Sequence, residues 1–142
     1  MKQIKLLMLL LLIIIASFSI QATFSLDTQE LVNGINSTSD LTQALEEAGN
    51  TNKSVLLIFD QASCYYCDLL KSDTLSDANV QKEINEKYIV VDVDVNKEAS
   101  LAAKYQVVGT PMIIILDSNG NQQGKIEGYV DANEFLAELK EI

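Results

Sequence analysis

The sequence predicts an α/β fold in which helices flank a central mixed β-sheet on both faces. Continuous apolar runs are typical of buried strands, and stretches with apolar residues at helical spacing stand before, between and after them. Near the C-terminus, a turn sequence joins two short strands and so adds antiparallel pairing. Strands that alternate with helices favour parallel crossovers, so we expect the sheet to contain both kinds of pairing.

The first 22 residues read as a leader. Lys2 and Lys5 precede an apolar run over residues 6–16, and small residues follow it, which is the pattern of a secretory signal peptide. Extended to Phe24, the run is also long enough for a membrane anchor, so cleavage stays open. In both cases the lysines hold the N-terminus in the cytoplasm and the rest of the chain lies outside it. We therefore expect an extracytoplasmic protein that contacts a membrane only through residues 1–22, if these are retained.

Composition limits the partners of the remaining chain. Residues 23–36 are interpreted as a linker with room for a short edge strand near Leu31–Ile35, and residues 37–142 as one domain. The sequence carries 20 acidic and 10 basic residues, a net charge of −10, and no histidine. This charge argues against binding to nucleic acid or anionic lipid, and the absence of histidine removes the commonest metal ligand. We expect a monomer with no metal.

The first half of the domain predicts helix, strand and two helices. After a polar start near Ser37, apolar residues recur at helical spacing: Leu41, Ala44, Leu45 and Ala48. Gly49-Asn50 is the expected end of this helix. Val55–Phe59 is a continuous apolar run, typical of a strand buried on both faces. A helix from Cys64 to about Ser72 follows, and another starts near Ser76.

The next segment predicts the second strand and a short helix. Over Tyr88–Val95, valines lie on one face of the strand and Asp92 and Asp94 on the other. Asn96 is expected to cap a helix that ends near Tyr105.

The C-terminal segment predicts a β-hairpin and a helix. Pro111 opens the third strand, Met112–Leu116, and the turn Asp117–Gly120 leads into a fourth strand at about Gln122–Tyr129. Asp131 and Glu134 have the spacing of a capping box, so a final helix that buries Phe135, Leu136 and Leu139 is expected.

The motif Cys64-Tyr65-Tyr66-Cys67 carries the chemistry. These are the only two cysteines, so each is the other's only intramolecular partner, and a two-residue spacer at a helix start brings both sulfurs within disulfide reach. Cys64 then faces unpaired backbone N–H groups and the positive end of the helix dipole, which favour its thiolate. The pattern predicts a reversible two-electron switch.

From about Ser37 to the C-terminus, the chain resembles the thioredoxin superfamily, especially its exported thiol–disulfide oxidoreductases. The resemblance depends on the cysteine motif after the strand Val55–Phe59 and on Gly109-Thr110-Pro111 before the strand Met112–Leu116. It implies a thioredoxin-like fold in which Cys64 is the exposed nucleophile and Cys67 the buried resolving thiol of a redox-active disulfide. No organic cofactor is implied.

The resemblance also implies a substrate groove. The Thr110–Pro111 bond would be cis and lie against the cysteines, with the backbone of Thr110 turned outward to pair with an extended substrate segment; a trans proline that starts an edge strand is the alternative. Gly128 matches a glycine that flanks the groove in the family, although turn geometry alone would also explain it. Tyr65 and Tyr66 are interpreted either as an aromatic lip for substrate or as ordinary residues at a helix start.

Two departures from thioredoxin concern charge. The family's buried aspartate aligns with Ile58, and its lysine aligns with Asp92. We hypothesise that Asp92 accepts the Cys67 proton, through water. The alternative is that Asp92 faces solvent at a sheet edge. Near Cys64 the spacer supplies no cation. Asp68 and Asp60 oppose the thiolate, and Lys71 is the only cation close in sequence. A moderately activated thiol favours a reductant or isomerase over a strong oxidant.

The leading interpretation is an extracytoplasmic protein-disulfide reductase or isomerase. Its partners would be proteins with thiols or disulfides, and a membrane redox partner would exchange electrons with it, because no pyridine-nucleotide reductant is available outside the cytoplasm. A binding module with a structural disulfide is the first alternative. A metal or iron–sulfur site is the second, but two thiolates without histidine would need a dimer to complete four ligands.

Overall fold

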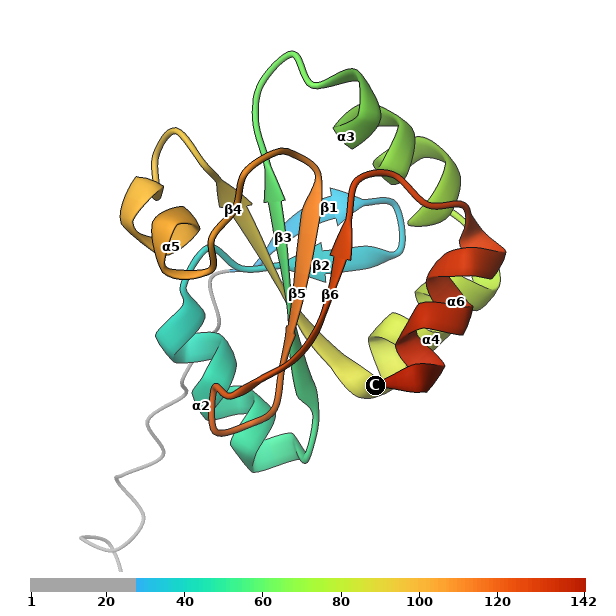
Figure 1. The fold of residues 1–142 in the computed structure, drawn as a ribbon. Helices are drawn as coiled ribbons and strands as arrows, with labels where there is room; N and C mark the ends of the chain where they lie inside the picture. Colours follow the sequence, from blue (N-terminus) through green and yellow to red (C-terminus); the bar gives the residue numbers. More distant parts are fainter. Residues whose placement is uncertain (1–27) are drawn as a thin grey trace, which may run out of the picture.

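A four-stranded mixed sheet forms the centre of the protein (Figure 1). The computed structural model describes residues 28–142, and the predicted leader lies outside them. The strand order is β4-β3-β5-β6, where the strands span Ser54–Asp60 (β3), Tyr88–Asp94 (β4), Met112–Leu116 (β5) and Gln122–Glu127 (β6). Strands β3 and β4 are parallel, and β5 pairs antiparallel with both β3 and β6. The predicted α/β fold with a mixed sheet is confirmed.

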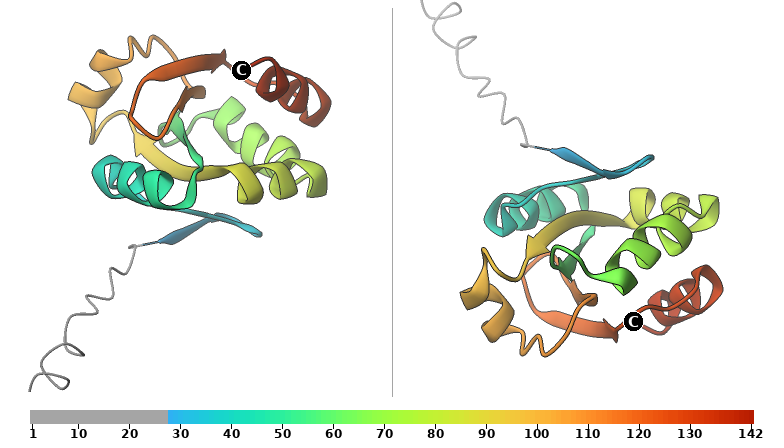
Figure 2. Two further views of the ribbon diagram at one scale, coloured as in Figure 1. Left: turned by 90° about the horizontal axis from the view of Figure 1, so that it is seen from below. Right: turned by 90° about the horizontal axis from the view of Figure 1, so that it is seen from above.

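Helices cover both faces of the sheet (Figure 2). On one face lie α2 (Leu41–Thr51) and α5 (Ala99–Lys104). On the other lie α3 (Tyr65–Leu69), the π-helical turn η1 (Leu70–Thr74), α4 (Ala78–Lys87) and α6 (Ala132–Glu141). Alternate residues of β3 face opposite sides, so Leu56 and Ile58 pack with the α4–α6 layer while Leu57 and Phe59 pack with α2 and α5. The protein therefore has two cores separated by one sheet.

The direction of β5 differs from the expectation that helix-separated strands run parallel. The chain leaves β4 at Asp94 and re-enters the sheet at Met112, which pairs with Phe59 at the same end of the sheet. Between them, the short helix α5 covers only six residues of the connection. Because the chain re-enters the sheet at the end where it left, β5 runs back against β3.

Three helix boundaries differ from the predicted ones. Helix α2 continues past Gly49-Asn50 to Thr51, and its C-cap Asn52 adopts a left-handed backbone. Asn96 does not cap α5, which begins after Glu98 without a side-chain cap; the Asn96 N–H donates instead to Asp94 Oδ1 at 2.9 Å. The helix from Cys64 changes into η1 at Leu70. Three helices have an aspartate cap: Asp40, Asp77 and Asp131 accept N–H groups in the first turns of α2, α4 and α6.

The segment interpreted as a linker contains a β-hairpin. Strands β1 (Gln29–Val32) and β2 (Ile35–Ser37) pair antiparallel around Asn33-Gly34, in place of a single edge strand over Leu31–Ile35. Gly34 has φ +94°, a conformation that favours glycine, and the Asn85 side chain donates to its carbonyl. Ile35 is fully buried, so the hairpin contributes to the core. Over residues 28–142, no helix combines the length and apolar character that crossing a bilayer requires.

Candidate active site

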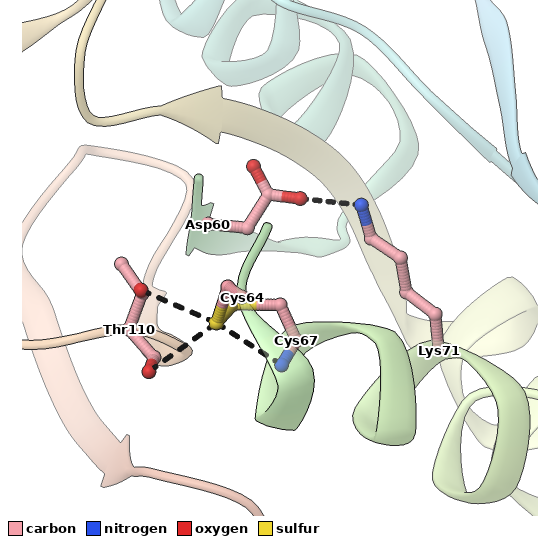
Figure 3. The surroundings of a disulfide bond; sticks show 5 residues. All are labelled: Asp60, Cys64, Cys67, Lys71 and Thr110. Atoms are coloured by element: carbon pink, nitrogen blue, oxygen red, sulfur yellow. Dashed lines mark hydrogen bonds and ion pairs between the residues drawn. A yellow bond between two sulfur atoms is a disulfide. The ribbon is translucent and has the colours of Figure 1, made fainter. Parts of the chain in front are cut away.

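Cys64 and Cys67 form a disulfide where β3 leads into α3 (Figure 3). Cys64 is the N-cap of α3 with an extended backbone (φ −96°, ψ 101°), and Cys67 lies in the first turn, so their Cα atoms are 5.2 Å apart. Cys64 is 9% exposed and Cys67 3%. Both cysteines are therefore buried at the start of α3, and Cys64 is the less buried of the two.

Hydrogen-bond donors converge on the sulfur of Cys64. The N–H of Cys67 donates to Cys64 Sγ at 3.2 Å, and the Thr110 hydroxyl donates to it at 3.4 Å. The Thr110 carbonyl oxygen lies 3.6 Å from the same sulfur, within reach of an S–H donor in the dithiol form. Donors aimed at a sulfur stabilise its negative charge. The site can therefore hold Cys64 either as a thiolate or as one half of the disulfide.

The loop before β5 forms a groove beside the disulfide. The Thr110–Pro111 peptide bond is cis, and Pro111 is buried. A groove of about 180 Å³ is lined by residues 108–112 together with Glu127 and Gly128. The Gly128 N–H donates to the Pro111 carbonyl at 2.9 Å. Gly128 has φ +81°, a backbone conformation that favours glycine. There is space for a side chain, because a Cβ at this position would meet no atom within 4 Å. Backbone conformation, not crowding, thus explains this glycine, which nevertheless lies in the groove wall.

Figure 3 shows an ion pair above the disulfide. Lys71 Nζ, from η1, donates to Asp60 Oδ2 at the end of β3, and both side chains are largely buried, at 26% and 14% exposure. Burial alone would lower the pKa of Lys71. The hydrogen bond to Asp60 and the charges of Asp92 and Asp60 outweigh it, so the pKa is raised and the lysine stays charged. The predicted cation near the site is present, but it is bound to Asp60.

Asp92 does not face open solvent at a sheet edge. It pairs in register with Ile58, whose side chain belongs to the core beneath α4 and α6, and Asp92 Oδ1 is buried without a hydrogen-bond partner among the described residues. Burial raises the pKa of the Asp92 carboxyl, the Asp60 charge raises it further, and Lys71 opposes the rise. The residue is therefore a carboxylic acid that is unusually easy to protonate, linked electrostatically to the Asp60–Lys71 pair. Whether it serves the cysteines stays a prediction.

Three tyrosines stand beside the disulfide. Tyr65 is 71% exposed and Tyr66 57%, and their rings meet edge to face with centroids 5.3 Å apart. Tyr66 also stacks on Tyr129, which follows Gly128, with centroids 6.5 Å apart and an interplanar angle of 27°. The Tyr129 hydroxyl donates to the Asp73 carboxylate in η1.

Tyr129 and Asp73 were not identified as site residues by sequence reasoning. Tyr129 was placed only as the end of a strand, and the 56 residues that separate it from Asp73 hide their contact. A usable signal was its position directly after Gly128, which the family resemblance had already placed at the groove.

Comparison with known proteins agrees with this geometry. Residues 41–142 match the family described as thioredoxin-like domain. The thiol:disulfide interchange protein DsbD of Campylobacter jejuni is 32% identical over 101 residues, which cover 69% of this chain and 18% of the relative. DsbD of Escherichia coli strain K12 is 31% identical over 127 residues, which cover 84% of this chain and 22% of the relative. The chain thus spans about a fifth of the length of these curated relatives.

Solved structures show the same fold. A thioredoxin from Thermus thermophilus superposes with a TM-score of 0.65 at 28% identity, over 71% of this chain and 82% of that one. The reduced C-terminal domain of DsbD from Neisseria meningitidis superposes with a TM-score of 0.61 at 25% identity, over 72% of this chain and 96% of that domain. Sequence and fold lead to the same assignment. The chain belongs to the thioredoxin-like domain family, within the thioredoxin superfamily.

Proposed function

We propose that the protein is a thiol–disulfide oxidoreductase that exchanges disulfides with protein substrates through Cys64 and Cys67. The observation that carries this proposal is the convergence of the Cys67 N–H and the Thr110 hydroxyl on Cys64 Sγ. Both donors stabilise the thiolate, which is the reactive form of the residue. The family match and the interchange proteins among its relatives support the same chemistry.

The exchange proceeds in two displacements. The Cys64 thiolate attacks one sulfur of a substrate disulfide, which forms a mixed disulfide and releases the other substrate sulfur as a thiolate. The thiol of Cys67 then loses its proton and attacks Cys64 Sγ, so that the Cys64–Cys67 disulfide forms and the second substrate sulfur leaves. Two electrons pass from the cysteine pair to the substrate, and the reverse sequence oxidises a substrate dithiol. Asp92 is the proposed acceptor of the Cys67 proton, through water, because its raised pKa makes it a stronger base than an ordinary carboxylate.

The groove beside the cysteines is the proposed substrate site. An extended segment would pair with the backbone of Thr110 and lie against Pro111 and Gly128, whose residues line the groove. Tyr65 and Tyr66 would contact substrate side chains, since both rings are mostly exposed next to the reactive sulfur.

We propose a reductant or isomerase rather than a strong oxidant. Lys71, the cation closest in sequence to the motif, bonds to Asp60, and Asp68 is exposed one residue after Cys67. Cys64 therefore depends on neutral donors for activation, which favours moderate stabilisation of the thiolate.

The proposed location is outside the cytoplasm, supported by the leader pattern that starts at Lys2. A monomer there would draw electrons from a membrane redox partner. Among the described residues, no group of three or more cysteine, aspartate or glutamate side chains is placed to hold a metal ion.

A trapping experiment tests the proposal. The Cys67→Ser variant is mixed with a disulfide-containing model protein, and the expected product is a covalent adduct at Cys64 that dithiothreitol releases. The matched Cys64→Ser variant should form no adduct. A binding module with a structural disulfide would retain its partner in both variants and form no adduct in either. The proposal fails if nothing is trapped and the wild-type dithiol form does not reduce the model disulfide.

A further inference from the structure

The stacked tyrosines form a fixed wall beside the reactive disulfide. Tyr66 lies between the two cysteines in α3, and Tyr129 comes from the loop between β6 and α6, so two distant segments meet at this stack. More than half of the Tyr66 side chain remains exposed. An approaching substrate side chain can therefore reach an aromatic ring next to the sulfur that it must react with.

Asp73 holds this wall in place. Its carboxylate accepts the Tyr129 hydroxyl, and this hydrogen bond raises the pKa of Tyr129 to about 12. Next to this contact, the buried Thr74 hydroxyl donates to the Val130 carbonyl at 2.5 Å. Two neighbouring hydrogen bonds thus tie η1 to the loop that carries Tyr129. The ring stays neutral and is pre-oriented, and its phenol is polarised by the carboxylate.

The surroundings of the wall are acidic. Asp68 and Asp73 are exposed on α3 and η1, and Asp131 is exposed two residues after Tyr129. The lysine of the same segment, Lys71, is bound to Asp60 and is turned to the opposite side of the disulfide from Thr110 (Figure 3). Aromatic faces bordered by carboxylates attract cations, through the ring quadrupole and through direct charge pairing. This combination disfavours acidic side chains at the same place.

We infer that Tyr66 and Tyr129, held by Asp73, select protein substrates that carry an arginine or a lysine next to the reactive cysteine. Arginine fits best, because a planar guanidinium can stack on a ring while it donates to a carboxylate. The inference rests on the proposed function and adds the class of substrate. Asp73 is a positioning residue, since it acts on the substrate chiefly through Tyr129.

Peptide disulfides provide the test. Three peptides differ only in the residue next to cysteine, which is arginine, leucine or glutamate, and each is reduced by the dithiol form of the full chain. Because a neighbouring charge also alters the leaving thiol, each rate constant is divided by the one for dithiothreitol with the same peptide. Exposed cation–π contacts and surface ion pairs are weak, so we expect the arginine peptide to react about three- to tenfold faster than the glutamate peptide.

Two variants locate the origin of that preference. Asp73→Asn removes the charge but retains a polar group, and Tyr129→Phe retains the ring but removes the hydrogen bond. Both should reduce the arginine-to-glutamate ratio to less than about twofold. Surface contacts of this kind are weak, so little preference remains once one of them is removed. The matched control is Glu46→Gln, an exposed acid on α2 across the sheet, which should leave the ratio at its wild-type value. Urea unfolding of each variant verifies that it is folded.

The outcomes separate the inference from the proposed function. A ratio near one in the wild type, a glutamate preference, or an unchanged ratio in both variants overturns the cation selection. If the leucine peptide reacts fastest, the wall binds apolar residues instead, and the inference is again overturned. If neither the peptides nor the neutral hydroxyethyl disulfide is reduced, the proposed function itself fails.

Discussion

Replacing Asp92 with asparagine should make the fold more stable and the exchange slower. The wild-type side chain has a buried Oδ1 without a hydrogen-bond partner among residues 28–142, and burial raises its pKa. Ionisation of this carboxyl therefore costs more in the folded protein than in the unfolded chain. Asparagine has nearly the same shape and cannot ionise, so the variant removes the charge alone.

The sign of the pH dependence follows from the raised pKa. Below the unfolded value of about 3.9, the carboxyl is protonated in both states and costs nothing. As the pH rises through the folded pKa, the folded state must release a proton that the unfolded state has already lost, so wild-type stability falls. The stability advantage of Asp92→Asn should therefore be small at pH 4 and largest at pH 8.

The magnitude follows from the charge on the unpaired group. A buried polar group without a partner costs about 1–3 kcal/mol, and more when it is charged; asparagine keeps an unpaired polar atom and removes only the additional cost of the charge. The Asp92 side chain is only partly buried and Lys71 offsets part of the cost, so we take the lower end, about 1 kcal/mol at pH 8. With an m-value of about 1–2 kcal/mol/M, the urea midpoint of the oxidised variant should rise by roughly 0.5–1 M.

Asp94 provides a control of opposite sign on the same strand. The N–H of Asn96 donates to its carboxylate and lowers the pKa of Asp94, so this group stabilises the fold above its unfolded pKa. Asp94→Asn should therefore lose stability relative to wild type as the pH rises.

In the exchange assay above pH 7, Asp92→Asn should slow the resolution step more than about threefold if it removes a base. A stability difference between Asp92→Asn and wild type that is flat from pH 4 to 8, or that favours wild type at pH 8, would refute the reasoning.

Three further changes test the supports of the site. Gly128→Ala forces a side chain into φ +81° and should cost about 1–2 kcal/mol in urea unfolding, whereas Gly109→Ala, which has a free site for Cβ and no positive φ, should cost less. Thr74→Val leaves the Val130 carbonyl without its buried donor, so we expect a loss of about 1–3 kcal/mol by the same measurement; no loss would mean that water replaces the hydroxyl. Asp73→Asn should lower the pKa of Tyr129 from about 12 toward its ordinary value, read from the ultraviolet absorbance of the phenolate; an unchanged titration would contradict the hydrogen bond.

The parts of the fold that depend on local pattern were predictable from the sequence. Val55–Phe59 and Met112–Leu116 are continuous apolar runs, and both form central strands that are buried on both faces. The cysteine pair was equally predictable, because its chemistry lies within four consecutive residues. The turn at Asn33-Gly34 carried a standard hairpin signal, but a polar setting hid the two short strands on either side.

The remaining features depend on contacts between distant residues. The reversal of β5 depends on the end of the sheet at which the chain re-enters after α5, which no single motif reports. Asp60 and Lys71 are eleven residues apart, and their pairing depends on how η1 turns. The environment of Asp92 similarly depends on which layer covers its face of the sheet. Sequence pattern therefore identified the two cysteines that form the disulfide, while the charges and rings around them required the three-dimensional arrangement.

The π-helical turn has a consequence for chimeras built from this protein. η1 contains an additional residue compared with an α-helical turn, and it directly follows the cysteine helix. Each residue of an α-helix advances about 100°, so deleting one residue between Cys67 and Thr74 would rotate one end of the segment by that amount relative to the other. A graft of the cysteine helix from another thioredoxin-like protein must therefore bring a segment of equal length. Otherwise the transplanted cysteines and the Thr74–Val130 hydrogen bond cannot both keep their positions.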